Sequence, residues 1–112
     1  MALTRTLGAD EWQAPIEIQN AYWRLIKAAV IRDLEGNAPL NGEQDERTVK
    51  YIVRVSFAVY STAPDIQGKG YVHSHMMDID LSAVLASAGD NFVAQVYNAV
   101  KQEPMFAGAQ DV

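Results

Sequence analysis

Apolar and polar side chains alternate most regularly over residues 48–60. Every second residue from Val49 to Val59 is apolar, and the series is rich in β-branched and aromatic types: Val49, Tyr51, Val53, Val55, Phe57 and Val59. Such alternation predicts a half-buried antiparallel strand. Because the run is about twice the usual strand length of five or six residues, we expect a bulge or a strand that extends beyond the body of the domain.

A second alternating run, over residues 71–81, predicts another strand. Its odd positions carry both histidines of the chain and several apolar residues: Tyr71, His73, His75, Met77, Ile79 and Leu81. Residues 61–70, between the two runs, contain Pro64 and two glycines, which are typical of a loop. The two strands are therefore expected to pair antiparallel across this loop.

Residues 16–31 fit a helix and a strand about equally well. As a helix, the apolar positions fall at spacings of four, three and four: Ile18, Tyr22, Leu25 and Ala29. As a strand, one face carries Trp23, Leu25, Ala29 and Ile31, and the other carries Tyr22, Ile26 and Val30. Arg24 and Lys27 then lie on opposite faces, so the alternation is imperfect. The alanines favour a helix slightly, and the residues alone leave both interpretations open.

Residues 33–47 predict a long connection. They contain two glycines, a proline and an Asn41-Gly42 pair, which readily supplies the positive φ angles of a tight turn. A loop of about fifteen residues is long for a compact domain, and such loops are often functional or disordered. The ordinary interpretation is an acidic, solvated loop tip.

The last third of the chain has helical periodicity. Asp80 is expected to precede a short helical turn over 83–86, and Asp90 to cap a longer helix over 90–102 that Pro104 ends. The apolar stripe of the longer helix consists of Phe92, Val93, Val96, Tyr97 and Val100. We expect Phe92, Val96 and Val100 of this stripe to face the strand residues Val49, Val53, Val55, Phe57 and Val59.

Together these elements predict an α+β fold. A small antiparallel sheet, a meander of residues 16–31, 48–60 and 71–81, is expected to have the C-terminal helix packed on one face. Residues 1–15 are predicted to be an irregular N-terminal arm, because glycine, proline and charged residues interrupt any period there. Residues 16–112 then form the single domain.

Four apolar residues near the two ends of the chain are candidate partner contacts: Trp12, Leu7, Phe106 and Met105. Tryptophan is enriched at the buried centres of interfaces, which favours terminal segments that dock on a neighbouring subunit. The alternatives are a loose tail or a strap over the domain's own core, both of which are common for terminal segments.

Composition excludes several classes of protein. The chain has 112 residues, which suits one domain, and nine Lys and Arg against fourteen Asp and Glu give a net charge of −5. This balance leaves no basic stripe, so nucleic-acid binding is not expected. The absence of cysteine excludes disulfides, thiolate metal sites and cysteine nucleophiles. No signal-peptide pattern or membrane-spanning run occurs, so we expect neither export nor a membrane partner.

His73 and His75 have the only spacing that suggests a metal site. On a strand they share a face at a separation of about 6.5–7 Å, but Asp78 and Asp80 project to the opposite face and no further histidine exists. Two ordinary, half-exposed histidines are the simpler interpretation, and their near-neutral pKa permits pH-sensitive contacts. The carboxylate pairs, glycines and serines match no catalytic or phosphate-binding pattern. We predict a non-enzymatic protein without catalytic residues, cofactor or metal.

Two stretches of the chain carry a family resemblance. The first is Ile18–Arg24, with the motif Asn20-Ala21-Tyr22; the second is residues 91–112, in which a helix leads into Glu103-Pro104-Met105-Phe106 and then Gly108-Ala109-Gln110-Asp111-Val112. This pattern resembles a family of small tailed-bacteriophage proteins encoded among virion structural genes, whose turn reads Leu-Pro-Glu-Phe. The pattern of helix and turn fits, while individual residues depart. The resemblance implies that residues 16–31 form a strand.

The resemblance also implies a virion component of the tail or baseplate region, made in the cytoplasm of the bacterial host. Virion parts assemble through symmetric interfaces, so the expected partners are other virion proteins and further copies of the chain, as a homo-oligomer or within a symmetric assembly. One alternative is a capsid decoration or cement protein. Another is a small phage-encoded regulatory or host-interaction binding module. An enzyme would have to use His73 and His75, the only candidate catalytic residues.

Overall fold

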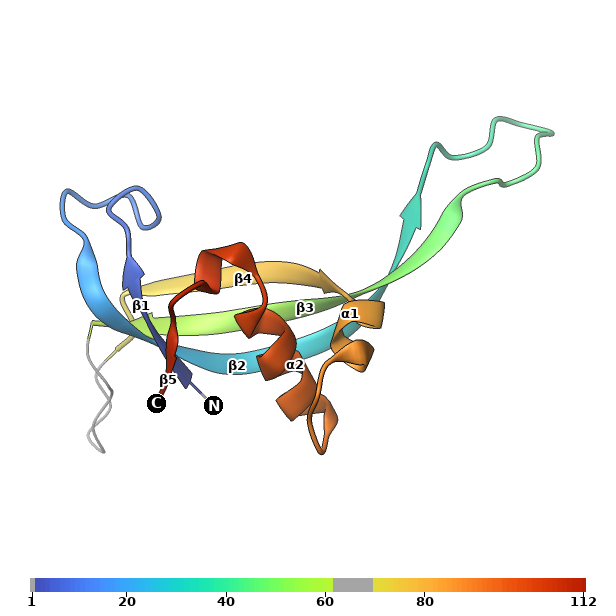
Figure 1. The fold of residues 1–112 in the computed structure, drawn as a ribbon. Coiled ribbons are helices and arrows are strands. Elements are labelled where there is room, and N and C mark those ends of the chain that lie inside the picture. Colours follow the sequence, from blue (N-terminus) through green and yellow to red (C-terminus); the bar gives the residue numbers. More distant parts are fainter. Residues whose placement is uncertain (1, 62–69) are drawn as a thin grey trace.

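A computed structural model describes residues 2–61 and 70–112, which form an α+β fold (Figure 1). An antiparallel five-stranded sheet has the order β4-β3-β2-β1-β5. The elements are β1 (Ala2–Leu7), β2 (Ile18–Glu35), β3 (Thr48–Tyr60), β4 (His73–Asp80), α1 (Leu81–Ala86), α2 (Phe92–Lys101), the 3₁₀ turn η1 (Pro104–Phe106) and β5 (Gln110–Asp111). The predicted fold class and the meander of the three long strands are confirmed. Most of the loop predicted over 61–70 lies outside the described residues.

Residues 18–35 form one strand, β2, which decides between the two interpretations of this segment. Pairing with β3 along most of its length provides backbone partners, and such tertiary context overrides a slight local preference for helix. The register shifts between Leu25 and Lys27, so Ile26 is the extra residue of a β-bulge. The bulge places Lys27 on the same face as Arg24, which accounts for the imperfect alternation in the sequence.

The bulge also overturns the predicted faces of the second half of β2. Beyond it, Val30 pairs with Val53 and lies on the face that carries Trp23. Ala29 and Ile31 lie on the opposite face, so their predicted position beside Trp23 was wrong. One inserted residue exchanges the two faces, because the side chains of a strand alternate with a period of two.

The core lies between one face of the sheet and the helices (Figure 1). Its fully or almost fully buried large side chains are Trp23, Phe57, Phe106, Leu3, Leu7, Val53, Val55, Val59, Val84, Val96 and Val100. The helix stripe and the strand face therefore share one core, and Phe92 packs against it. Two predicted positions differ: Val93 of the stripe is 51% exposed, and Val49 is 43% exposed because β3 has passed beyond the helices there.

Helix α2 begins one residue later than predicted. Asn91, not Asp90, is the N-cap, and its side-chain oxygen accepts a hydrogen bond from the backbone N–H of Ala94 at 2.9 Å. Gly89 joins α1 to α2 with a φ of +153°, and a Cβ there would lie 2.7 Å from the backbone nitrogen of Gln95. Only glycine fits this close approach of the connection to the backbone of α2.

The N-terminal residues belong to the sheet, so the irregular arm predicted over 1–15 was wrong for its first half. Residues 2–7 form β1, which pairs with β2 on one side and with the short β5 on the other. Leu3 and Leu7 are fully buried. The sequence concealed this strand because Arg5 occupies an inward position between them, where its guanidinium lies over the ring of Trp23 at 5.1 Å.

Candidate interaction surface

The hairpin of β2 and β3 extends well beyond the rest of the sheet (Figure 1). Strand β4 pairs with β3 only as far as Ile52, whereas the pairing of β2 with β3 continues to Glu35 and Thr48. We call residues 32–51 the hairpin arm. The molecule measures 57 × 37 × 27 Å along its principal axes. The prediction of a strand that extends beyond the body is confirmed.

The loop of the hairpin arm turns at Asn41 and Gly42, as predicted. Gly42 has a φ of +85°, in the left-handed region that glycine adopts at little cost. The backbone N–H of Glu43 donates to the carbonyl oxygen of Leu40 at 2.9 Å and closes the turn. Almost every residue of the loop is exposed.

One side of the hairpin arm is mostly apolar and uncovered, with Arg32 opposite Tyr51 at its base. Leu34 pairs with Val49, and Tyr51 is the next residue of β3 on the same side; the three are 37–49% exposed. They continue the face that the helices bury elsewhere. Leu85 of α1, 58% exposed, lines a shallow hollow beside Tyr51 at the base of the arm. Contiguous exposed apolar surface marks interaction sites, so this side is the first part of the candidate surface.

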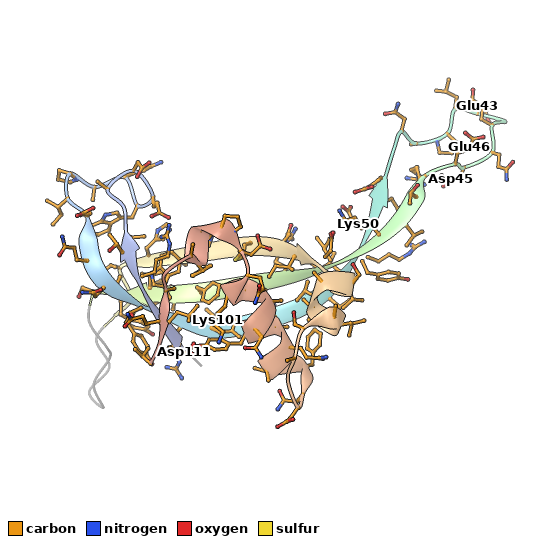
Figure 2. The ribbon with its side chains drawn as sticks, in the orientation of Figure 1. Glu43, Asp45, Glu46, Lys50, Lys101 and Asp111 are labelled. Atoms are coloured by element: carbon orange, nitrogen blue, oxygen red, sulfur yellow. The ribbon has the colours of Figure 1, made fainter. Side chains whose placement is uncertain are left out.

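The end of the hairpin arm is acidic (Figure 2). Residues 33–47 contain five carboxylates and one guanidinium, which gives −4 of the chain's net charge of −5. Asp45 accepts hydrogen bonds from Arg47 at 2.6 and 2.9 Å, and these bonds lower the pKa of Asp45 to about 2. Glu43 and Glu46 take part in none of the ion pairs between described residues. Two carboxylates at the tip are therefore available to a partner.

The sheet face turned away from the helices is the second part of the candidate surface, and no described helix or strand packs on it. We call it the open face; its side chains come from Tyr22, Arg24, Lys27, Ala29 and Ile31 of β2, Ile52, Arg54, Ser56, Ala58 and Tyr60 of β3, and Ser74, Met76, Asp78 and Asp80 of β4. Met76 is 63% exposed. The rings of Tyr22 and Tyr60 lie edge to face, with centres 6.2 Å apart.

Charges on the open face fall into two groups. Near the base of the hairpin arm, Arg54 pairs with Asp78 at 2.9 Å and lowers the pKa of that carboxyl. Asp80 pairs there with Lys50 at 3.1 Å. Arg24 and Lys27, further along β2, take part in none of the ion pairs between described residues. Sequence reasoning missed this cationic pair. The available signal was the broken alternation between positions 24 and 27, which a bulge explains.

The four residues predicted to contact partners are used mainly within the chain. Leu7 and Phe106 are buried, and the ring of Phe106 lies against that of Trp23 at 5.4 Å. Trp12 and Met105 are partly buried against the same core. The strap over the domain's own core, given above as an alternative, describes these residues better than contact with a neighbour does.

Both ends of the chain are held against the sheet. The hydroxyl of Tyr97 lies 2.7 Å from the carbonyl oxygen of Ala2 and 2.6 Å from the carboxylate of Asp111. Lys101 approaches the same carboxylate at 3.4 Å (Figure 2). Burial and the Asp111 carboxylate raise the pKa of Tyr97. One tyrosine of α2 therefore joins β1 to β5, and both strands belong to the body.

His73 and His75 lie on β4 with ring centres 6.4 Å apart. Among the described residues, no group of three or more His, Cys, Asp or Glu side chains is placed to hold a metal ion. Asp78 is on the open face, opposite the histidines, as the alternation predicts. His75 instead packs against Trp23, with ring centres 5.7 Å apart.

The free energy of unfolding is expected to decrease as the pH falls below about 6.5. Partial burial lowers the pKa of His75; His73 and Arg5 act in the same direction, and Glu11 opposes them. The folded chain then binds protons less readily than the unfolded chain. Stability is therefore present above the pKa of unfolded histidine and is lost as the pH falls through the lowered pKa of His75.

Urea unfolding at a series of pH values between about 8 and 5 measures this effect. We expect H75Q to flatten the curve, because it removes the group that titrates. The matched variant H73Q keeps His75 and is expected to retain most of the slope. A wild-type curve that is flat over this range would contradict the prediction.

No protein-family model, curated protein or solved structure matches this chain. Of the helices in the described ranges, none is both long enough and apolar enough to cross a membrane. Function is therefore inferred from the hairpin arm and the open face.

Proposed function

We propose that the chain is a non-enzymatic structural component of a tailed-bacteriophage virion, located in the tail or baseplate region, that acts through protein–protein contacts. The observation that carries this proposal is the hairpin arm. A two-stranded hairpin is at best marginally stable alone in water, yet this one extends beyond the body with Leu34, Val49 and Tyr51 exposed on one side. A partner that covers this side would stabilise the arm and fix its direction.

The titratable groups favour a structural role over catalysis. Acid–base catalysis needs carboxyl groups whose environments move the pKa toward neutrality. Asp45, Asp78 and Asp111 all have a pKa below the ordinary value, because neighbouring side chains donate hydrogen bonds to them. These carboxylates therefore remain charged and hold local structure in place.

The phage assignment within this proposal comes from the resemblance of Asn20-Ala21-Tyr22 and of residues 103–112 to small virion proteins. One implication of that resemblance, a strand over residues 16–31, agrees with β2. The closing segment fits as well, because Pro104 begins a 3₁₀ turn that leads into β5.

Mass spectrometry of gradient-purified particles, from a phage that encodes this chain, tests the proposal. We expect the chain at a stoichiometry comparable with that of other tail components, and we expect negative-stain microscopy of a tagged copy to place the tag on the tail. A tag on the shell would replace the proposal with a capsid decoration protein. Absence from purified particles would overturn it and favour a regulatory or host-interaction module.

A further inference from the structure

The apolar side of the hairpin arm is not covered by the described body of the same chain. Strand β2 runs for four residues beyond Ile31, whose partner Ile52 is the last residue of β3 that pairs with β4; this is about 13 Å at the rise of a strand. It stays paired with β3 to its end, so the two strands project together. The tip, with Glu43 and Glu46, lies further out still (Figure 2). The described body of the same chain therefore leaves this side of the arm uncovered.

The open face of a second copy has chemistry complementary to the hairpin arm. The arm presents an apolar side followed by two carboxylates that lack a cation among the described residues. The open face presents Met76 and the tyrosine pair beside Arg24 and Lys27, which lack a carboxylate among the same residues. Charges of opposite sign across an interface speed encounter and fix the register.

From this charge and surface complementarity we propose that the hairpin arm of one copy packs across the open face of a second copy, with Glu43 and Glu46 beside Arg24 and Lys27. The inference rests on the assembly role proposed above and names the partner and both surfaces. Stacking of a β-ribbon on a sheet face is an ordinary packing of two β-layers. Pairing two arms with each other would leave Arg24 and Lys27 without carboxylates, so the observations favour contact between arm and open face.

This contact joins two different surfaces, so it is heterologous. A bound pair keeps one free arm and one free open face, so the series either closes into a ring or continues as a filament. Purified chain is therefore expected to form oligomers larger than a dimer as its concentration rises. The same contact buries the apolar side of every arm except the one at the end of an open series whose arm is free.

Charge reversal of each surface, alone and together, tests the proposal by analytical ultracentrifugation of the purified chain. The tip variant E43K/E46K and the face variant R24E/K27E are each expected to associate at least about tenfold more weakly than wild type. The combined variant, with all four reversals, is expected to recover association, because opposite charges again meet. D90K/E103K changes the net charge as the tip variant does, away from both surfaces, and is expected to associate as wild type does.

A mixture of two variants tests whether the arm of one copy binds the open face of the other. A chain whose arm is shortened keeps only the open face, and the face variant keeps only a functional arm. Mixed in equal amounts, they are expected to form a 1:1 dimer that does not grow further. Growth of larger species, or no dimer, would overturn the contact between arm and open face.

Three further results would overturn the proposal: a monomeric wild type at the highest attainable concentration, a tip variant as strong as D90K/E103K, or a combined variant that is folded but does not recover. Measuring wild-type association over a series of salt concentrations needs no variant, and association that fails to weaken with rising ionic strength also contradicts the proposal.

The amount of the chain in purified particles is measured separately. A chain present in virions but monomeric in solution defeats this inference alone, whereas a chain that self-associates but is absent from particles defeats the virion proposal alone.

Discussion

Replacing Trp23 by alanine is expected to lower the free energy of unfolding by about 3–5 kcal/mol, the range found when a large core aromatic is truncated. The side chain is fully buried, and its ring meets those of Phe57, His75 and Phe106 at 5.4–6.0 Å. Its indole N–H donates to the carbonyl oxygen of Arg5 at 3.0 Å, which ties β1 to β2. The loss would be a large part of the stability of a small domain.

Urea unfolding followed by circular dichroism measures this change. W12A is the matched control, because Trp12 is only partly buried and donates to the exposed carbonyl of Ile16. It is expected to cost clearly less than W23A. Equal losses for the two variants would contradict the placement of Trp23 at the centre of the core.

Removal of the hairpin arm is expected to abolish incorporation into particles and to leave the body folded. Replacing residues 33–50 with an Asn-Gly turn joins Arg32 to Tyr51, which already face each other in the ladder. Pairing of β3 with β4 begins at Ile52, so no β3–β4 ladder pair is removed. We expect a free energy of unfolding within about 1 kcal/mol of wild type, since a solvated hairpin stabilises the body little.

The two results are measured separately, as urea unfolding of the purified variant and as its amount in gradient-purified particles. A variant with Leu34 and Val49 both changed to threonine keeps the ladder, removes much of the apolar side, and is expected to be incorporated poorly as well. Normal incorporation of the armless variant would show that the arm is not the contact. A large loss of stability would show instead that the arm supports the body.

Much of the fold follows from local pattern. Residues 48–60 alternate so regularly that both the strand and its projection beyond the body were predictable, and so was the long helix with its apolar stripe. The turn within residues 36–47 was predictable, because Asn-Gly and proline fix local backbone geometry, whereas residues 33–35 of the predicted connection belong to β2. The first strand was not, since Arg5 occupies an inward position that only the ring of Trp23, distant in the sequence, makes favourable.

The candidate surface was less accessible to sequence reasoning. The residues chosen at the chain ends, Trp12 and Phe106 among them, are apolar and lie near a terminus; both features fit a strap over the core as well as a docking segment. The cationic pair was hidden because Arg24 and Lys27 fall on opposite faces of any regular strand. A single bulged residue, Ile26, brings them to one face.

By itself the sequence determined which strongly periodic segments form strands and which form helices, and where the acidic turn lies, because these depend on residues close together in the chain. Its composition alone excluded cysteine-based chemistry. The tertiary structure decided between helix and strand for residues 18–35, since pairing with β3 outweighs propensity there. It also decided which side chains are exposed. Leu34, Val49 and Tyr51 continue an apolar pattern that is buried elsewhere in the chain, and they remain uncovered only because the helices end before the hairpin arm begins.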